Sequence, residues 1–143
     1  MASTERRIDN KYGEQYELLK SLAFADIYLN KKDGILLVYY YPDTEIDASK
    51  AQVIINSVDP IISAHNLLYG MTDAREENLN ITREARSLYS DNPTLKLSKR
   101  HAVIVNQLTT RMLANFFVKI DQPVIPTKVF NSLSAAEKWL ISN

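Results

Sequence analysis

Polar residues with the potential for chemistry follow a short apolar stretch of the chain, residues 67–71. They begin with Thr72 and Asp73 and lead into residues 80–86, which have the pattern of a helix start. A strand that runs into a helix leaves free backbone N–H groups at one edge of a sheet, where α/β proteins usually place functional residues. We therefore predict a protein-binding surface at this edge, formed by Thr72, Asp73, Arg75, Thr82, Arg83 and Arg86.

Two features of this surface each have two interpretations. Thr82 is a candidate phosphorylation site, because a phosphate there would meet the positive end of a helix dipole and the guanidinium of Arg83 or Arg86. The commoner role of Thr at this position is to cap the helix by accepting a hydrogen bond from a free N–H group. In the same way, the charged stretch 73–77 is either a surface that a partner recognises or a solvated loop, and the solvated loop is the commoner meaning.

The other reactive residue types do not form a recognisable catalytic or metal site. His65 and His101 are the only histidines, and no carboxylate stands at metal-ligand spacing from them. The chain has no cysteine and only three glycines. It contains neither the serine elbow of hydrolases nor a glycine-rich phosphate loop. We expect no catalytic residue, no metal and no cofactor.

Composition and charge limit the classes of partner and the compartment that we expect for this protein. The chain has 143 residues, of which 45% are hydrophobic, as expected for one globular domain. Seventeen basic side chains balance seventeen acidic ones, which gives no electrostatic reason to bind nucleic acid. The longest apolar run, residues 35–41, is too short to cross a bilayer, and residues 1–7 lack the apolar region of a secretory signal. We expect a cytoplasmic protein with no membrane span and no nucleic-acid partner; self-association stays open.

The elements that must position the polar residues follow from hydrophobic periodicity and turn residues. Asp33-Gly34 is typical of a hairpin turn between two strands. Asp47 is suited to cap a helix, in which Pro60 predicts a kink or an early stop. Ser132 and Ser134 are both suited to cap the last helix. The complete prediction is strands over 22–29, 35–41, 67–71, 102–105 and 128–130, and helices over 47–62, 82–89, 108–120 and 134–140.

The predicted order is therefore β-β-α-β-α-β-α-β-α. It describes an α/β domain with a mixed sheet of about five strands and about four helices, because strands separated by helices pair in parallel through crossovers. We assign residues 1–17 to a mobile N-terminal segment and residues 18–143 to the single domain.

The element order, together with residues 128–140, resembles the STAS or anti-sigma-factor-antagonist family, in particular the bacterial SpoIIAA-like proteins. The resemblance covers roughly residues 20–141. It implies a STAS-like fold and a cytoplasmic regulatory module that binds proteins, although some relatives bind nucleotides or lipids. In that family an Asp-Ser-Ser-Gly stretch after the third strand carries a phosphorylated Ser. Residues 80–83 occupy that place here with Thr82 as their only hydroxyl, and they contain neither the Asp nor the Gly.

Two functions from different classes follow. The first is a non-enzymatic regulatory or scaffolding module that binds another protein through the loop and helix start after the third strand. The second is a small-ligand or lipid-binding domain that uses an apolar groove beside the predicted helix with Phe116 and Phe117. A cavity on the order of a few hundred cubic ångströms would favour the ligand, whereas a filled core beneath an exposed polar loop would favour the protein partner.

Overall fold

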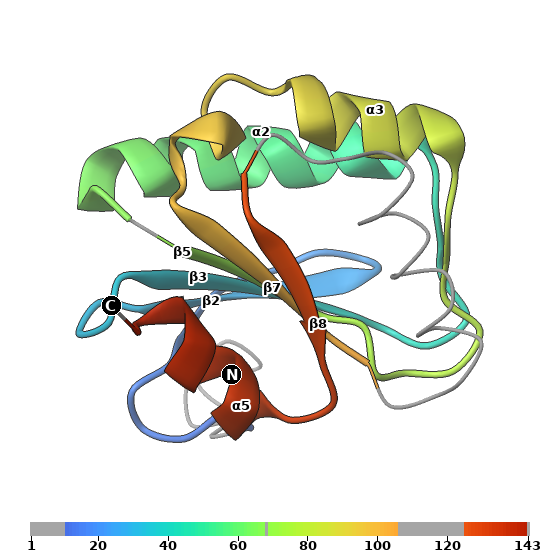
Figure 1. Cartoon of the computed structure of the whole chain (residues 1–143). Helices are drawn as coiled ribbons and strands as arrows, with labels where there is room; N and C mark the ends of the chain where they lie inside the picture. Colours follow the sequence, from blue (N-terminus) through green and yellow to red (C-terminus); the bar gives the residue numbers. More distant parts are fainter. Residues whose placement is uncertain (1–10, 68, 106–124, 143) are drawn as a thin grey trace, which may run out of the picture.

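A six-stranded sheet with helices on both faces forms the domain (Figure 1). The computed structural model describes residues 11–67, 69–105 and 125–142. The sheet has the order β1-β2-β3-β5-β7-β8. Strands β1 to β3 pair antiparallel, and the remaining pairs are parallel. The strands are β1 (Glu17–Ser21), β2 (Ala25–Asn30), β3 (Ile35–Tyr40), β5 (Tyr69–Asp73), β7 (Arg100–Ile104) and β8 (Thr127–Phe130).

Among the described residues, two helices cover one face of the sheet and a third covers the other (Figure 1). Helices α2 (Ala48–His65) and α3 (Arg83–Asp91) lie together on the first face, and α5 (Leu133–Leu140) lies on the second. A short 3-10 helix, η1 (Leu95–Leu97), follows α3. Two short parallel strands, β4 (Glu45–Ile46) and β6 (Asn80–Ile81), pair where the chain enters α2 and α3. No helix in these described ranges is long and apolar enough to cross a membrane.

The turn between β2 and β3 confirms the predicted hairpin. The Asn30 side chain bonds Asp33 twice, through its Nδ2 to Oδ2 at 3.1 Å and through its Oδ1 from the Asp33 N–H at 3.0 Å. Gly34 follows with a φ of 71°, a backbone conformation that glycine adopts without steric cost. This turn sets the register of β3 against β2.

Side-chain caps begin the helices where the sequence predicts them. Asp47 Oδ1 accepts from the Lys50 N–H at 2.9 Å, and Thr82 Oγ1 accepts from the Ala85 N–H at 3.2 Å. Of the two candidate serines, Ser132 caps α5. The capping role of Thr82 is therefore confirmed.

The predicted early stop at Pro60 is wrong, because α2 continues past it to His65. Pro60 is exposed, and so is Asn56, whose carbonyl loses its usual helical partner to the proline ring. On the solvent side of a helix a carbonyl can bond water instead, so a proline costs less there than on the buried side.

Strand β3 separates two apolar cores, and all six of its residues are buried. Leu36, Val38 and Tyr40 belong to the core beneath α2 and α3. The intervening residues, Ile35, Leu37 and Tyr39, belong to the core beneath α5. Strand β3 is therefore a central strand that is covered on both faces.

Several parts of the structure differ from the prediction, and the short elements β4, β6 and η1 were not predicted. Strand β1 was not predicted, because it is an edge strand whose five residues are all at least partly exposed and give little hydrophobic pattern. Within the segment assigned as mobile, Tyr12 and Tyr16 are 7% and 4% exposed and pack in the core beneath α5. The predicted helix over 108–120, with Phe116 and Phe117, lies outside the described residues.

Candidate functional site

One residue of the predicted surface, Asp73, lies in the interior. Asp73 ends β5 and is only 1% exposed. Arg75 holds its carboxylate at two points, with Nε to Oδ1 at 2.9 Å and Nη2 to Oδ2 at 2.8 Å. The Tyr12 hydroxyl also donates to Oδ2, at 2.6 Å. Asp73 therefore organises this end of the sheet and is not exposed to a partner.

The Asp73 carboxylate is ionised in spite of its burial. Burial opposes ionisation, but the hydrogen bonds from Arg75 and Tyr12 outweigh it and hold the pKa of Asp73 below its usual value. The pKa of Tyr12 is raised by burial and then by the charge of Asp73, so its hydroxyl stays protonated. The neutral Tyr12 hydroxyl and the Arg75 cation thus both donate hydrogen bonds to the Asp73 anion.

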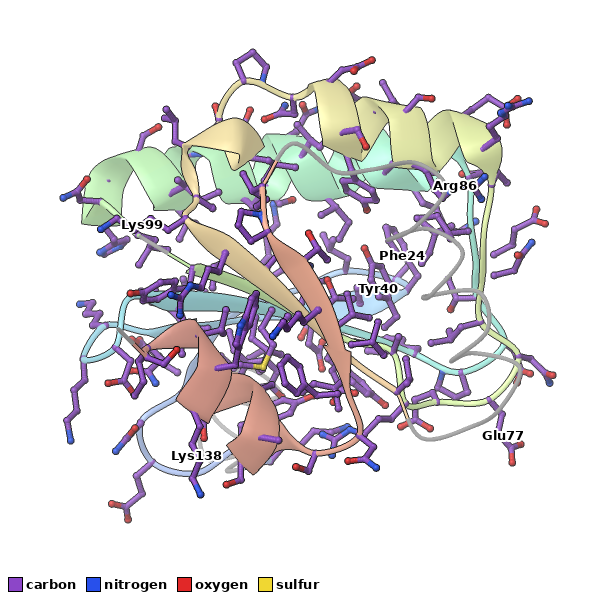
Figure 2. The ribbon with its side chains drawn as sticks, viewed as in Figure 1. Phe24, Tyr40, Glu77, Arg86, Lys99 and Lys138 are labelled. Carbon is purple, nitrogen blue, oxygen red and sulfur yellow. The ribbon has the colours of Figure 1, made fainter. Side chains whose placement is uncertain are left out.

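The loop between β5 and β6 is fixed along its length. The Tyr39 hydroxyl donates to Glu76 Oε2 at 2.6 Å, and the Asp43 N–H donates to the Glu77 carbonyl at 2.9 Å. Asn78 Nδ2 bonds Asp43 Oδ1 at 2.7 Å. The Glu77 side chain points away from the domain (Figure 2), and both Glu77 and Asn78 are exposed.

The second part of the predicted surface is the start of α3. Thr82 is half-buried and caps the helix, and Arg83 is exposed. Arg86 is half-buried and donates from Nη1 to the Ile81 carbonyl at 3.2 Å. Of the six predicted residues, Arg83 is thus the one with an exposed side chain, while Asp73 is buried and the other four are half-buried.

A cavity of about 220 Å³ lies between the sheet and helices α2 and α3. The sequence does not predict a cavity at this place. Its walls are largely aliphatic side chains from β3, α2 and β7, among them Leu36, Val38, Ile54, Val58, Ile62 and Val103. Tyr40 lies in the layer between the sheet and these helices in Figure 2.

Two hydrogen-bonded pairs of side chains line the cavity. Thr72 Oγ1 and His101 Nε2 are 2.9 Å apart, and the hydroxyls of Tyr40 and Tyr89 are 2.8 Å apart. Burial lowers the pKa of His101 to about 4 and raises that of Tyr40 to about 12. All four side chains are therefore neutral near pH 7. No charged residue is among the described residues that line the cavity.

The Thr72–His101 pair has the spacing of a nucleophile and its base, but it lacks other properties of such a site. A working base needs a pKa near the operating pH and a third group that orients the ring. Burial keeps the pKa of His101 far below that range. Its Nδ1 packs against Gly70, where an added Cβ would stand 2.7 Å away. His65, the other histidine, lies at the end of α2 and is exposed.

Comparison with known proteins identifies the fold and a family. A family model described as "Domain of unknown function (DUF7793)" matches residues 28–142. Among solved structures, the chain is similar to an uncharacterised DUF3478-family protein with a SpoIIAA-like fold from Shewanella loihica PV-4. The TM-score is 0.59 at 15% identity, over 85% of this chain and 98% of that chain. The comparison with curated proteins finds no match. The predicted SpoIIAA-like α/β fold is confirmed.

Proposed function

Because the chain belongs to the DUF7793 family, which is described only as a domain of unknown function, its own cavity is the best guide, and we propose that it is a non-enzymatic domain that binds a small apolar ligand. The single observation that carries this proposal is the apolar cavity of about 220 Å³ between the sheet and helices α2 and α3. Ligand sites are typically apolar hollows with a few polar groups that orient the ligand.

Two further observations support binding without catalysis. Four polar residues of the cavity wall, Thr72 with His101 and Tyr40 with Tyr89, form hydrogen-bonded pairs and are neutral, as orienting groups are. The low pKa of His101 makes it a weak base.

Benzene tests the proposal, because an apolar cavity of about 150 Å³ is large enough to bind it. We expect saturable shifts in the methyl NMR signals of Val38, Ile54 and Val58, which line the cavity. The methyl signals of Ile35 and Leu37, in the opposite core, should stay unchanged. An absence of saturable shifts, or equal shifts in both cores, would contradict the proposal.

A matched pair of variants on α2 sharpens the test. Val58 is 2% exposed and lines the cavity, whereas Val53 on the same helix is 40% exposed. Val58→Phe adds a ring where there is space, so benzene binding should be lost while the fold is kept. Val53→Phe adds the same ring at the surface and should leave binding unchanged. Equal effects of the two variants would count against the cavity as the site.

A second candidate function keeps the role that the resemblance to anti-sigma antagonists implies, a cytoplasmic regulatory or scaffolding module that binds a protein. The observation that favours it is the ordered loop between β5 and β6, which presents Glu77 and Asn78 in a fixed geometry next to the start of α3. A surface that is ordered before binding loses less conformational entropy when a partner docks.

Site-specific photo-cross-linking in the native host tests this second candidate. A cross-linking amino acid in place of the exposed Arg83 should yield one defined adduct. The same amino acid in place of Lys32, exposed on the β2–β3 turn, serves as the control and should yield none. Identical adduct patterns from the two positions would argue against a surface at α3.

A further inference from the structure

The tyrosine pair that lines the cavity has one hydrogen-bond donor that no described residue accepts. The hydroxyls of Tyr40 and Tyr89 are 2.8 Å apart, so one of them donates and the other accepts. Each phenol carries one proton, and only one of the two protons is used in this bond. Within the described residues, neither hydroxyl has a further hydrogen-bond partner. The hydroxyl that accepts therefore keeps an O–H group that can donate to a ligand.

The volume of the cavity limits the size of the ligand. A dry cavity of about 150 Å³ holds benzene, which has six non-hydrogen atoms. Scaled by volume, a cavity of about 220 Å³ holds a compact molecule of about nine non-hydrogen atoms. A molecule of this size is held within the cavity, whereas a long acyl chain or a nucleotide would extend beyond it.

The charge of the cavity limits the chemistry of the ligand. The described lining residues contain no Asp, Glu, Lys or Arg. Burial raises the pKa of Tyr40 to about 12 and raises that of Tyr89 as well, so both phenols stay neutral donors. A carboxylate or ammonium group would lose its water without gaining an opposite charge from these residues, which is costly.

We infer that the ligand is a compact uncharged molecule with one carbonyl-type acceptor. This acceptor bonds the O–H of the Tyr40–Tyr89 pair that is not used within the pair. The inference rests on the proposed ligand-binding function. An aryl ketone has this size and this chemistry. The aliphatic walls contact its ring, and the tyrosine pair fixes the direction in which the carbonyl lies.

Three probes of matched size test the inference. Acetophenone carries the acceptor, ethylbenzene has nearly the same shape without it, and benzoate carries a charge. We expect acetophenone to bind about tenfold more tightly than ethylbenzene, which is the effect of one well-placed hydrogen bond. Benzoate should bind more weakly than both. If ethylbenzene binds as tightly as acetophenone, or if benzoate binds best, the inference is overturned while the proposed function stands. If none of these probes nor benzene binds, the proposed function itself fails.

Variants of the pair give a distinctive pattern. Tyr40→Phe and Tyr89→Phe each leave one hydroxyl with a free proton, so each single variant should keep the preference for acetophenone. The double variant has no donor and should lose it. Tyr41→Phe is the control, because the Tyr41 hydroxyl bonds Asp26 at 2.5 Å and does not line the cavity. Retention of the preference in a folded double variant would overturn the inference.

A spectroscopic measurement tests the same bond without any substitution. The carbonyl stretch of acetophenone moves to lower frequency when the oxygen accepts a hydrogen bond from a phenol. We expect this downward shift for acetophenone bound to the unaltered protein, relative to acetophenone in an alkane. A bound carbonyl with the alkane frequency would overturn the inference.

Discussion

The Tyr12 hydroxyl donates a 2.6 Å hydrogen bond to Asp73 Oδ2, and this bond joins residues 61 positions apart. It holds the segment before β1 against the end of β5, on the side of the sheet that α5 covers. The same carboxylate receives Arg75, so one buried anion organises both the N-terminal segment and the loop after β5.

Tyr12→Phe should destabilise the protein by about 2 kcal/mol, because the buried Asp73 carboxylate loses a hydrogen bond that it receives as a charged group. Urea unfolding measures the change. Tyr41→Phe is the matched control: its partner Asp26 is half-buried, so water replaces the lost bond and the cost should be smaller. Equal losses of unfolding free energy in the two variants would show that the Tyr12 hydrogen bond stabilises the fold no more than the Tyr41 bond does.

Arg75→Ala should cost about 2 kcal/mol near pH 7. This is less than the usual cost of breaking a fully buried ion pair, because the Arg75 side chain is 31% exposed. Asp73 has a lower pKa in the folded state than its unfolded value of about 3.9, so its contribution is complete above that pH and is lost as the pH falls through the folded value. The difference between the unaltered protein and the variant should therefore shrink on acidification from pH 6 to pH 3. Arg83→Ala, at an exposed arginine, should change stability little at any pH.

His101 should make stability depend on pH in a higher range. Its folded pKa of about 4 lies below the unfolded value of about 6.5, so the unfolded chain takes up a proton first as the pH falls. Stability should be complete above pH 6.5 and decrease toward pH 4, by at most about 3 kcal/mol from this group. His101→Gln should flatten the pH profile, and His65→Gln, at the exposed end of α2, should not. A profile that His101→Gln leaves unchanged would rule out the imidazole as its origin.

Gly70→Ala should destabilise the protein by about 1–3 kcal/mol, because the new Cβ would stand 2.7 Å from His101 Nδ1 and force a shift. The contact is between two residues, so a double-mutant cycle isolates it. In a His101→Ala background, the same glycine substitution should cost almost nothing. An equal cost in both backgrounds would place the strain in the backbone of Gly70 and not in the imidazole contact.

Local features of the fold could be predicted from the sequence because their signals are local. The hairpin depends on Asp33 and Gly34, and the Asp33 N–H donates to the side chain of Asn30 three residues earlier. The helix starts depend on Asp47 and Thr82, whose side chains each accept from a backbone N–H three residues later. Strand β1 could not be predicted, because its pairing with β2 comes from the backbone and its side chains are largely exposed.

The candidate site was predictable only in part. The position of Thr72 and Asp73 at the end of a strand could be predicted from the sequence. Their hydrogen-bond partners could not, because His101 and Tyr12 lie 29 and 61 residues away. No local pattern reports such a pairing, so the burial of Asp73 and the partial burial of Thr72 could not be predicted. A cavity depends on how side chains of several elements fail to fill a shared space, which periodicity does not encode. The helix with Phe116 and Phe117 stays a prediction.

Successive residues of β3 point into opposite cores, so the length of the turn before β3 decides which side chains enter each core. Odd-numbered residues of β3 face one core and even-numbered residues face the other. Deleting one residue between Asn30 and Gly34 would rotate the strand by half a turn relative to β2. Tyr39 would then enter the core beneath α2 and α3, and Tyr40 would enter the core beneath α5. Length at this turn is thus under stronger constraint than composition, and an insertion of two residues would be better tolerated than an insertion of one.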